Sequence, residues 1–494
     1  MPIPLIIKYQ THDNNYLLDV ETNEILRVSE LIYDIIECHH TLSRNAIVEK
    51  FRVRYEENRI DSALLAIESL SNKGLLVPKT SPTTPKIKGI FLNNRPYTFE
   101  AFLKTYSRML TLELTHDCNL DCEYCCFGKH YPRHRKRGAE TISKDIAELA
   151  IRHHLDMPES GRTITFYGGE PLLEFQLLRH CVLYAEKYCE CKHYGKPSFS
   201  FTTNGTLLSS EILHFLVAHD FNIHISLDGD KESHDRYRVF REGRQGSFET
   251  IMKNIHKFVH LYPHYSKRGL MITLTASSNF FQINQLLKSL LPSYPTSIVN
   301  FVNDLDDASE PCTINKCDTP RCSKKYEEPL TSNFPDFSVW TNERLEMYKM
   351  CWSEFYKVLK NSGFINAQKE WPLIAKLFDT QFRSVYTRAV KPYHFHRVAC
   401  CCIPGAVRLY CSTGGHYFPC EKVEFSESLK IGNVWSGIDS QKVERMINFM
   451  EEATDCINCV GKHLCVACPD YITESTPGVF SDTHIKKGCG RHFR

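Results

Sequence analysis

The stretch that decides the fold is Thr115-His-Asp-Cys118-Asn-Leu-Asp-Cys122-Glu-Tyr-Cys125. It places three thiols with three and two residues between them, directly after a predicted strand over Met109–Thr115. A loop at the carboxyl end of the first strand of a barrel is where such folds build active sites. Three thiolates on a cubane of four irons and four sulfurs leave one iron open to another ligand. A zinc site or three buried thiols is the alternative, and Cys126 does not fit the spacing.

Short apolar segments alternate with helix-length segments through the next two hundred residues. This alternation predicts an α/β fold, in which a parallel sheet with right-handed crossovers closes fully or partly into a barrel. After the first strand, the further strands are predicted at Thr163–Tyr167, Phe199–Thr203, Asn222–Leu227, Leu270–Thr275 and Ile298–Val302.

Polar and glycine-rich motifs stand in order at the ends of the next three predicted strands. They are Tyr167-Gly168-Gly169-Glu170-Pro171, Thr203-Asn204-Gly205 and Ser226-Leu227-Asp228-Gly229, with Arg238 twelve residues beyond Ser226. Taken singly, each residue is equally well a turn glycine, a strand-end cap or a surface arginine. Asp228 is either a proton acceptor or a cap.

Together these motifs resemble the radical S-adenosylmethionine (SAM) superfamily, whose fold is a partial, TIM-like (β/α)6 barrel. The resemblance implies a [4Fe-4S] cluster on Cys118, Cys122 and Cys125, with its open iron chelated by S-adenosylmethionine. The glycines would let the backbone approach the cofactor's amino group, Glu170 would add charge complementarity, and Arg238 would suit its carboxylate. The cofactor-binding residues implied by the resemblance are Tyr124, Gly168, Gly169, Glu170, Asn204, Ser226 and Arg238.

The C-terminal hundred residues are dense in cysteine and resemble the auxiliary-cluster extension called the SPASM domain. The resemblance implies an outer [4Fe-4S] cluster on Cys456, Cys459, Cys465 and Cys489, and an inner one on Cys402, Cys420 and Cys468. Two residues, rather than the usual three, separate Cys465 from Cys468. The fourth inner ligand is Cys400, Cys401 or Cys411, or the position is kept for a substrate thiolate. A pair of structural zinc ribbons is the alternative.

The first 88 residues resemble the winged-helix-like precursor recognition elements of peptide maturases. Predicted strands Ile3–Tyr9, Tyr16–Val20 and Ile25–Val28 precede helices around Ile32–Ile36 and Leu64–Leu70. Such units bind a leader peptide as an added strand at a sheet edge, although a merely structural or dimerising wing fits the same pattern. The predicted division is 1–88 for recognition and linker, 105–302 for the barrel, 303–397 as a bridging region with a helix over Trp340–Leu359, and 398–494 for the SPASM domain.

The overall composition limits the classes of binding partner and the cellular compartment that we expect, but it does not indicate the reaction. The chain has 494 residues, 22 of them cysteine, and a formal net charge of +2, which favours neither nucleic acid nor an anionic membrane as a partner. No leader or long apolar run is evident, so we expect a cytoplasmic protein whose thiols bind metal rather than form disulfides. Cys312, Cys317 and Cys322 are interpreted as free thiols in a loop.

The whole chain resembles maturases of ribosomally synthesised peptides, especially those that form cysteine thioethers. This implies a precursor peptide with a leader as substrate and a reductant such as flavodoxin or ferredoxin. Carbon-carbon cross-linking needs the same protein parts. The alternatives are an anaerobic sulfatase-activating enzyme, which forms formylglycine, and a cluster-bearing electron carrier or peptide scaffold without turnover.

Overall fold

The structure is a computed structural model of the chain. It describes residues 3–11, 13–20, 22, 24–77, 90–92, 95–125, 127–128, 135–158, 161–275, 278–290, 293–294, 296–302, 331–332, 341–386, 403–423, 425–452, 473–476 and 479–481. The chain forms two compact units. One comprises Leu103–Phe382 and Pro404–Ser440, and the other comprises Met1–Phe102, Arg383–Ile403 and Gln441–Arg494.

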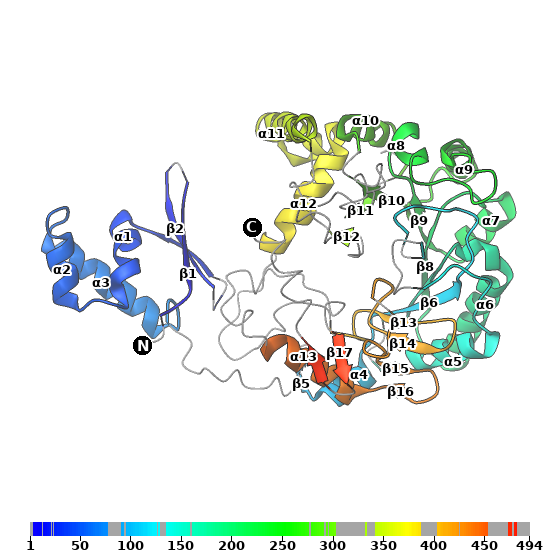
Figure 1. Ribbon diagram of the computed structural model, residues 1–494, viewed down its shortest axis with the longest axis horizontal. Coiled ribbons are helices and arrows are strands. Elements are labelled where there is room, and N and C mark those ends of the chain that lie inside the picture. Colours follow the sequence, from blue (N-terminus) through cyan, green and yellow to red (C-terminus); the bar gives the residue numbers. More distant parts are fainter. Residues whose placement is uncertain are drawn as a thin grey trace, which may run out of the picture. The chain divides into compact units, whose positions relative to one another are not determined.

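The larger unit is built on six parallel strands that pair in the order of the chain. The strands are β6 (Met109–Thr115), β7 (Thr163–Gly168), β8 (Ser198–Thr203), β9 (Asn222–Ser226), β10 (Arg268–Leu274) and β11 (Thr296–Val302). Between them lie α5 (Lys144–Leu155), the 3-10 turn η1 (Pro171–Glu174), α6 (Phe175–Cys191), α7 (Ser210–Ala218), α8 (Lys231–Asp235), α9 (Phe248–Leu261) and α10 (Phe280–Leu290). Figure 1 shows the long helices on the outer side of the strands. The predicted barrel fold is confirmed.

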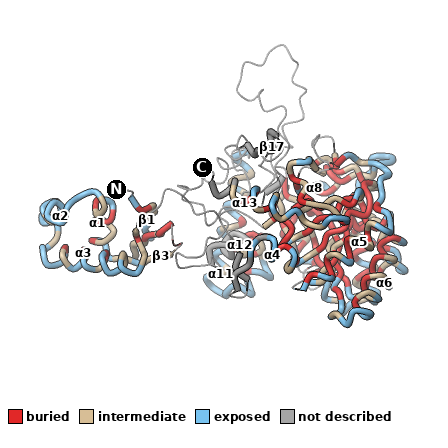
Figure 2. Tube along the Cα trace, turned by 90° about the horizontal axis from the view of Figure 1, so that it is seen from below, coloured by how far each residue is buried: buried red, intermediate tan, exposed pale blue. Residues whose placement is uncertain are grey.

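Strands β7, β8 and β9 each have one apolar face and one more polar face. In β7 the side chains of Ile164 and Phe166 are fully buried, and Figure 2 shows many buried residues inside this unit. The opposite faces carry residues such as Thr202 in β8 and His224 in β9, which are only partly buried. In a parallel sheet covered by apolar layers on both faces, the strands are instead continuous apolar runs. In these three strands the polar face is therefore less buried than the apolar face.

The barrel is partial because other strands occupy both of its edges. At one edge β13 (Leu409–Cys411) runs parallel to β6, and at the other β12 (Thr331–Ser332) runs antiparallel to β11. Beyond β13 the sheet continues through β14 (His416–Phe418), β15 (Gly432–Asn433) and β16 (Gly437–Ile438). Residues 404–440 thus share a sheet with the barrel, although the sequence pattern grouped them with the cysteine-rich tail.

The buried side chain of Arg135 joins β6 to the segment after β14. Arg135 donates from Nη1 to Oε1 of Glu113 at 2.7 Å and from Nη2 to the carbonyl of Glu421 at 2.5 Å. The guanidinium also lies over the rings of Phe127 and Phe425. Because Glu421 follows Cys420 in the chain, this network ties the Cys420 turn to the first barrel strand.

Two helices follow the barrel in the larger unit. They are α11 (Asn342–Glu370) and α12 (Pro372–Tyr386). The predicted helix over Trp340–Leu359 corresponds to the first part of α11, which changes direction at Gly363, where φ is 79°. The loop cysteines Cys312, Cys317 and Cys322 lie outside the described residues.

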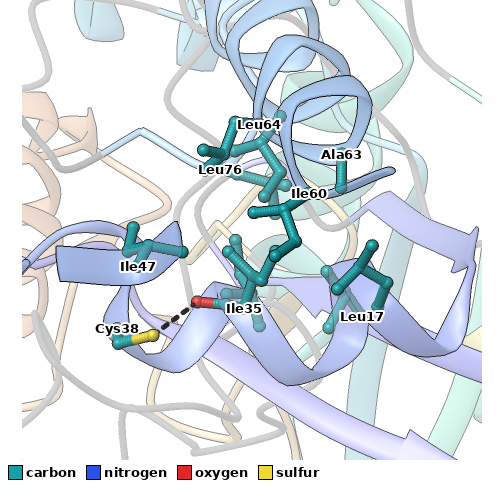
Figure 3. Packing of buried hydrophobic residues seen from close by; sticks show 11 residues of the cluster. Leu17, Ile35, Cys38, Ile47, Ile60, Ala63, Leu64 and Leu76 are labelled. Atoms are coloured by element: carbon teal, nitrogen blue, oxygen red, sulfur yellow. Dashed lines mark hydrogen bonds between the residues drawn. The ribbon is translucent and has the colours of Figure 1, made fainter. Parts of the chain in front are cut away.

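The N-terminal segment has an antiparallel sheet followed by three helices. The strands are β1 (Ile6–Gln10), β2 (Asn15–Asp19) and β3 (Glu24–Val28), and the helices are α1 (Glu30–His39), α2 (Arg44–Phe51) and α3 (Glu57–Asn72). The sheet order β1-β2-β3 leaves β1 and β3 as edges, and within the described part of the chain nothing pairs with their outer sides. Leu17, Ile35, Ile60 and Ile67 belong to one buried cluster, drawn in Figure 3. This segment therefore has a hydrophobic core of its own. The sequence prediction missed α2.

The remaining described elements are short, apart from one helix. They are β4 (Ile90–Leu92), β5 (Arg95–Tyr97), α4 (Phe99–Thr105), α13 (Ser440–Glu452), β17 (Thr473–Thr476) and β18 (Val479–Ser481). No helix in the described ranges is long and apolar enough to cross a membrane.

Candidate active site

The cysteine loop is held open by backbone pairing with a distant segment. The N–H of Asp121 donates to the carbonyl of Val239 at 2.8 Å, and the N–H of Glu123 donates to that of Tyr237 at 3.1 Å. The loop after β6 therefore forms a short ladder with the residues after α8. This pairing places Arg238 beside the cysteines, where the sequence order alone could not put it.

The two glycines after β7 fit against the backbone of the cysteine loop. A Cβ atom on Gly168 would lie 2.2 Å from the carbonyl oxygen of Thr115, and one on Gly169 would lie 2.0 Å from that of Asp117. Gly168 also has φ of +143°, which side chains rarely adopt. In the structure these glycines serve the contact between two strand-end loops. Their approach to a cofactor stays a prediction.

Replacing Gly169 with alanine is expected to lower the free energy of unfolding by about 1–3 kcal/mol, the usual cost of overpacking a filled site. The matched control is Gly138→Ala, because a Cβ atom there meets nothing within 4 Å. Anaerobic urea unfolding of both variants makes the comparison. Equal stability of the two variants would show that the close approach at Gly169 is not rigid.

Glu170 connects the end of β7 to the end of β8. Its Oε1 accepts from the Thr203 hydroxyl at 2.8 Å and the Leu172 N–H at 3.1 Å, and its Oε2 accepts from the Asn204 N–H at 2.7 Å. Burial raises the pKa of Glu170 to about 7, although these three donors favour the carboxylate. The carboxyl group thus organises the loop after β8, and a direct role toward a cofactor stays a prediction.

Asn204 links this loop to the first cysteine. Its Nδ2 lies 3.9 Å from the sulfur of Cys118 and donates to Oδ1 of Asn119 at 2.8 Å. Its Oδ1 accepts from both the N–H and the hydroxyl of Thr206, at 3.0 and 2.7 Å. The amide is therefore oriented with its N–H groups toward the cysteine loop.

Asp228 lies at the centre of a buried polar cluster between the second cysteine and the barrel. Its Oδ2 accepts from Nε of Arg238 at 2.7 Å and from the hydroxyl of Tyr124, and its Oδ1 accepts from the N–H of Thr273 at 2.9 Å. Nη1 of Arg238 lies 3.8 Å from the sulfur of Cys122. Burial alone would lower the pKa of Arg238, but Asp228, Tyr124 and Cys122 raise it above its usual range. Of the two roles considered for Asp228, the contacts favour the structural one.

A neutral histidine supports the same cluster from the side. Nδ1 of His234 accepts from the N–H of Asp228 at 3.2 Å, so its proton lies on Nε2, which is 3.0 Å from the hydroxyl of Ser247. That hydroxyl in turn donates to the carbonyl of Arg238 at 2.8 Å. Burial lowers the pKa of His234 to about 4. The ring is therefore uncharged at neutral pH and fixes the backbone on both sides of the ion pair.

Replacing Asp228 with asparagine is expected to lower the free energy of unfolding by about 3 kcal/mol, because it leaves the buried Arg238 guanidinium without its counter-ion. Asp220→Asn is the control, since Asp220 pairs with Lys267 at the surface and such pairs contribute less than about 1 kcal/mol. Urea titration under nitrogen measures both. Similar small losses would contradict a central role for Asp228.

The match to known protein families falls on this part of the chain. Residues 112–275 match the Radical SAM superfamily, and they contain the cysteine loop, the glycines and the Asp228 cluster. This region is a radical SAM domain. Through this domain the protein is an enzyme that uses S-adenosylmethionine and one [4Fe-4S] cluster.

The curated relatives differ in how much of this chain they match. The chain is 22% identical over 366 residues to a cysteine-type anaerobic sulfatase-maturating enzyme of Clostridium novyi (strain NT), which covers 72% of this chain and 86% of that protein. It is 32% identical over 158 residues to an AdoMet-dependent heme synthase of Methanosarcina barkeri (strain Fusaro / DSM 804). This alignment covers 30% of this chain and 38% of the heme synthase. Seven curated relatives, the heme synthase among them, are covered over only 38% to 65% of their length.

The solved structure of native anSMEcpe with bound AdoMet aligns with 72% of this chain and 88% of that chain. The TM-score is 0.50 and the sequence identity 17%, so this likeness shows the shared radical SAM fold.

The three thiols of the radical SAM domain fit a cluster better than a single metal ion. Without a bound metal, burial followed by the charge of Glu170 raises the pKa of Cys118, and burial raises the pKa of Cys122 to about 12 although Arg238 opposes the rise. Among the described residues, no three His, Cys, Asp or Glu side chains converge enough to hold one metal ion. The cysteines of a cubane each bind a separate iron, whereas zinc draws its ligands onto one centre. The donors beside the sulfurs likewise suit thiolates rather than thiols.

The other predicted site residues divide into those that the structure places and those that it does not describe. Ser226 is buried at the end of β9, Cys411 is buried in β13, and Cys420 is partly buried after β14. The predicted ligands Cys402, Cys456, Cys459, Cys465, Cys468 and Cys489, together with Cys126, Cys400 and Cys401, lie outside the described residues.

Sequence reasoning missed several residues around the radical SAM cysteines. Asn119 and Thr206 orient the Asn204 amide, His234 supports Asp228, and Arg137 reaches the loop from the segment after it. Asn119 lies inside the cysteine motif, so its position in the sequence could have marked it as a site residue. Nothing in the basic run Arg133-His-Arg-Lys-Arg137 distinguishes one arginine from the others.

Proposed function

We propose that the protein is a peptide maturase that installs cross-links, namely cysteine thioethers, in a ribosomally synthesised precursor peptide. The feature that carries this proposal is the N-terminal unit, which has its own core and two open sheet edges in addition to the radical SAM domain. An extended leader peptide can bind such an edge as an added strand. The unit would thereby hold the precursor while its core segment enters the barrel.

The radical SAM domain supplies the reactive chemistry in this proposal. When bound, the cluster and S-adenosylmethionine provide a 5′-deoxyadenosyl radical, which abstracts hydrogen from the acceptor carbon. In this proposal the thiol of a precursor cysteine would give up its proton to solvent as its sulfur bonds to that carbon, and an auxiliary cluster would accept the one surplus electron. Tyr124, Gly168, Gly169, Glu170, Asn204, Ser226 and Arg238 surround the cysteines or end the barrel strands, which supports their assignment to the cofactor site.

We further propose two auxiliary [4Fe-4S] clusters on the C-terminal cysteines. The described part of the inner site supports this proposal, because Arg135 ties the turn that carries Cys420 to β6, the strand that leads into the radical SAM cysteines. A reductant such as flavodoxin or ferredoxin would supply the first electron.

A second candidate function is anaerobic sulfatase maturation, which oxidises a Cys or Ser residue to formylglycine. The relative from Clostridium novyi favours it, because 86% of that protein is covered. That activity has no evident need for the N-terminal unit. Failure to cleave S-adenosylmethionine under reducing conditions would instead point to a scaffold or an electron carrier.

Anaerobic mass spectrometry distinguishes these functions. Reconstituted enzyme, reductant and S-adenosylmethionine are incubated with a precursor peptide encoded near this gene, and separately with a sulfatase-derived peptide. Loss of two hydrogens per link, together with protection of the affected cysteines from alkylation, supports thioether formation. Loss of two hydrogens with all cysteines still alkylated indicates carbon-carbon links, and an aldehyde in the sulfatase peptide indicates the second candidate.

A further inference from the structure

Arg137 lies against the cysteine loop in a position that the cofactor assignments do not use. It donates from Nη1 to the carboxylate of Asp121 and from Nη2 to the carbonyl of Cys122 at 3.3 Å, and its guanidinium lies close enough to the Cys125 sulfur for the two to interact electrostatically. Only 16% of its side chain is exposed. The guanidinium therefore spans the second half of the loop and ends at the third sulfur.

This contact completes a pattern around the three cysteines. Asn204 directs an amide N–H toward Cys118, Arg238 directs a guanidinium N–H toward Cys122, and the charge of Arg137 acts on Cys125. Each sulfur thus has one polar side chain from outside the loop beside it, and two of these three side chains carry a positive charge. Such an arrangement stabilises negative charge on the sulfurs.

Arg137 also has one N–H group that is not used in these contacts. Its Nε–H is buried and has no acceptor among the residues that the structure describes. Buried donors in proteins nearly always have a partner. A sulfide of a cluster bound to this loop would be such an acceptor.

We propose that Arg137 is a positioning residue that raises the reduction potential of the cluster on Cys118, Cys122 and Cys125. Hydrogen bonds to the sulfurs and nearby positive charge stabilise the reduced, more negative state of an iron-sulfur cluster. Partial burial strengthens this effect, because the charge of Arg137 is less screened than one in water. Arg137 thereby helps decide which cellular reductant can start the reaction. The inference rests on the three cysteines being the cluster ligands.

The test is a potentiometric titration of the reconstituted full-length enzyme, followed by electron paramagnetic resonance. The cluster that binds S-adenosylmethionine is recognised by the change of its signal when the cofactor is added. In Arg137→Gln the ratio of reduced to oxidised cluster at a fixed potential should fall about tenfold, which corresponds to 59 mV for one electron. Arg137→Lys keeps the charge without the planar fork, and its potential should lie between those of Arg137→Gln and the unmodified enzyme.

Arg244→Gln is the matched control. Arg244 shares Asp121 with Arg137, but 66% of its side chain is exposed and its ion pair is at the surface, so its loss should leave the potential unchanged. An unchanged potential in Arg137→Gln at full iron content would overturn the proposal. So would loss of iron with no shift in the remaining cluster, because that pattern marks a purely structural role. If the signal that responds to S-adenosylmethionine survives removal of the three cysteines, the ligand assignment itself fails.

Discussion

Replacing Cys118, Cys122 and Cys125 together with alanine is expected to abolish the formation of 5′-deoxyadenosine. The three sulfurs are the cluster ligands that we assign to the radical SAM domain, and without that cluster no electron reaches S-adenosylmethionine. Iron analysis should show the loss of one cluster, with the C-terminal clusters that we propose retained. Anaerobic chromatography of the cofactor products, alongside iron and sulfide determination, measures both effects.

The matched control for this triple variant is Cys181→Ala, Cys189→Ala and Cys191→Ala. These three cysteines lie on α6, at a distance along the chain from every motif of the site. The control should keep its iron and its cleavage activity. Continued cofactor cleavage by the first triple variant would refute the assignment of the cysteine loop.

Deleting residues 1–88 is expected to weaken binding of the leader peptide by at least about tenfold, while cofactor cleavage without peptide continues. The reason is that the deletion removes the sheet edges proposed to receive the leader but leaves the radical SAM domain whole. Binding is measured by fluorescence anisotropy of a labelled precursor, and cleavage by deoxyadenosine formation. Unchanged leader affinity would discard the recognition role.

Point variants in the full-length chain test whether leader binding depends on the folded N-terminal segment, without removing any part of the chain. Ile35 is fully buried in the N-terminal core, so Ile35→Asp should unfold that unit and mimic the deletion. Leu65 is 56% exposed on α3, and Leu65→Asp makes the same chemical change at the surface. Leader binding should be lost in the first variant and kept in the second. Loss of binding in both would mean that surface charge, rather than the folded unit, governs it.

The sequence by itself determined the barrel and the position of its reactive loop. The barrel strands are short segments rich in apolar residues that alternate with helix-length segments, and their order along the chain is their order in space, so the six strands were predicted within a few residues. The spacing of Cys118, Cys122 and Cys125 and the motif Gly168-Gly169-Glu170 are local features, and they led to the radical SAM domain without a structure.

Only the tertiary structure decided which distant groups surround the sulfurs. Asn204 is 86 residues from Cys118, and Arg238 is 116 residues from Cys122, so no local period or spacing reveals these contacts. The same holds for β13, which takes the edge of β6 and keeps the barrel open. Hydrogen bonds and ion pairs between segments depend on how the strand ends converge in space, and the sequence records only the residue types that take part.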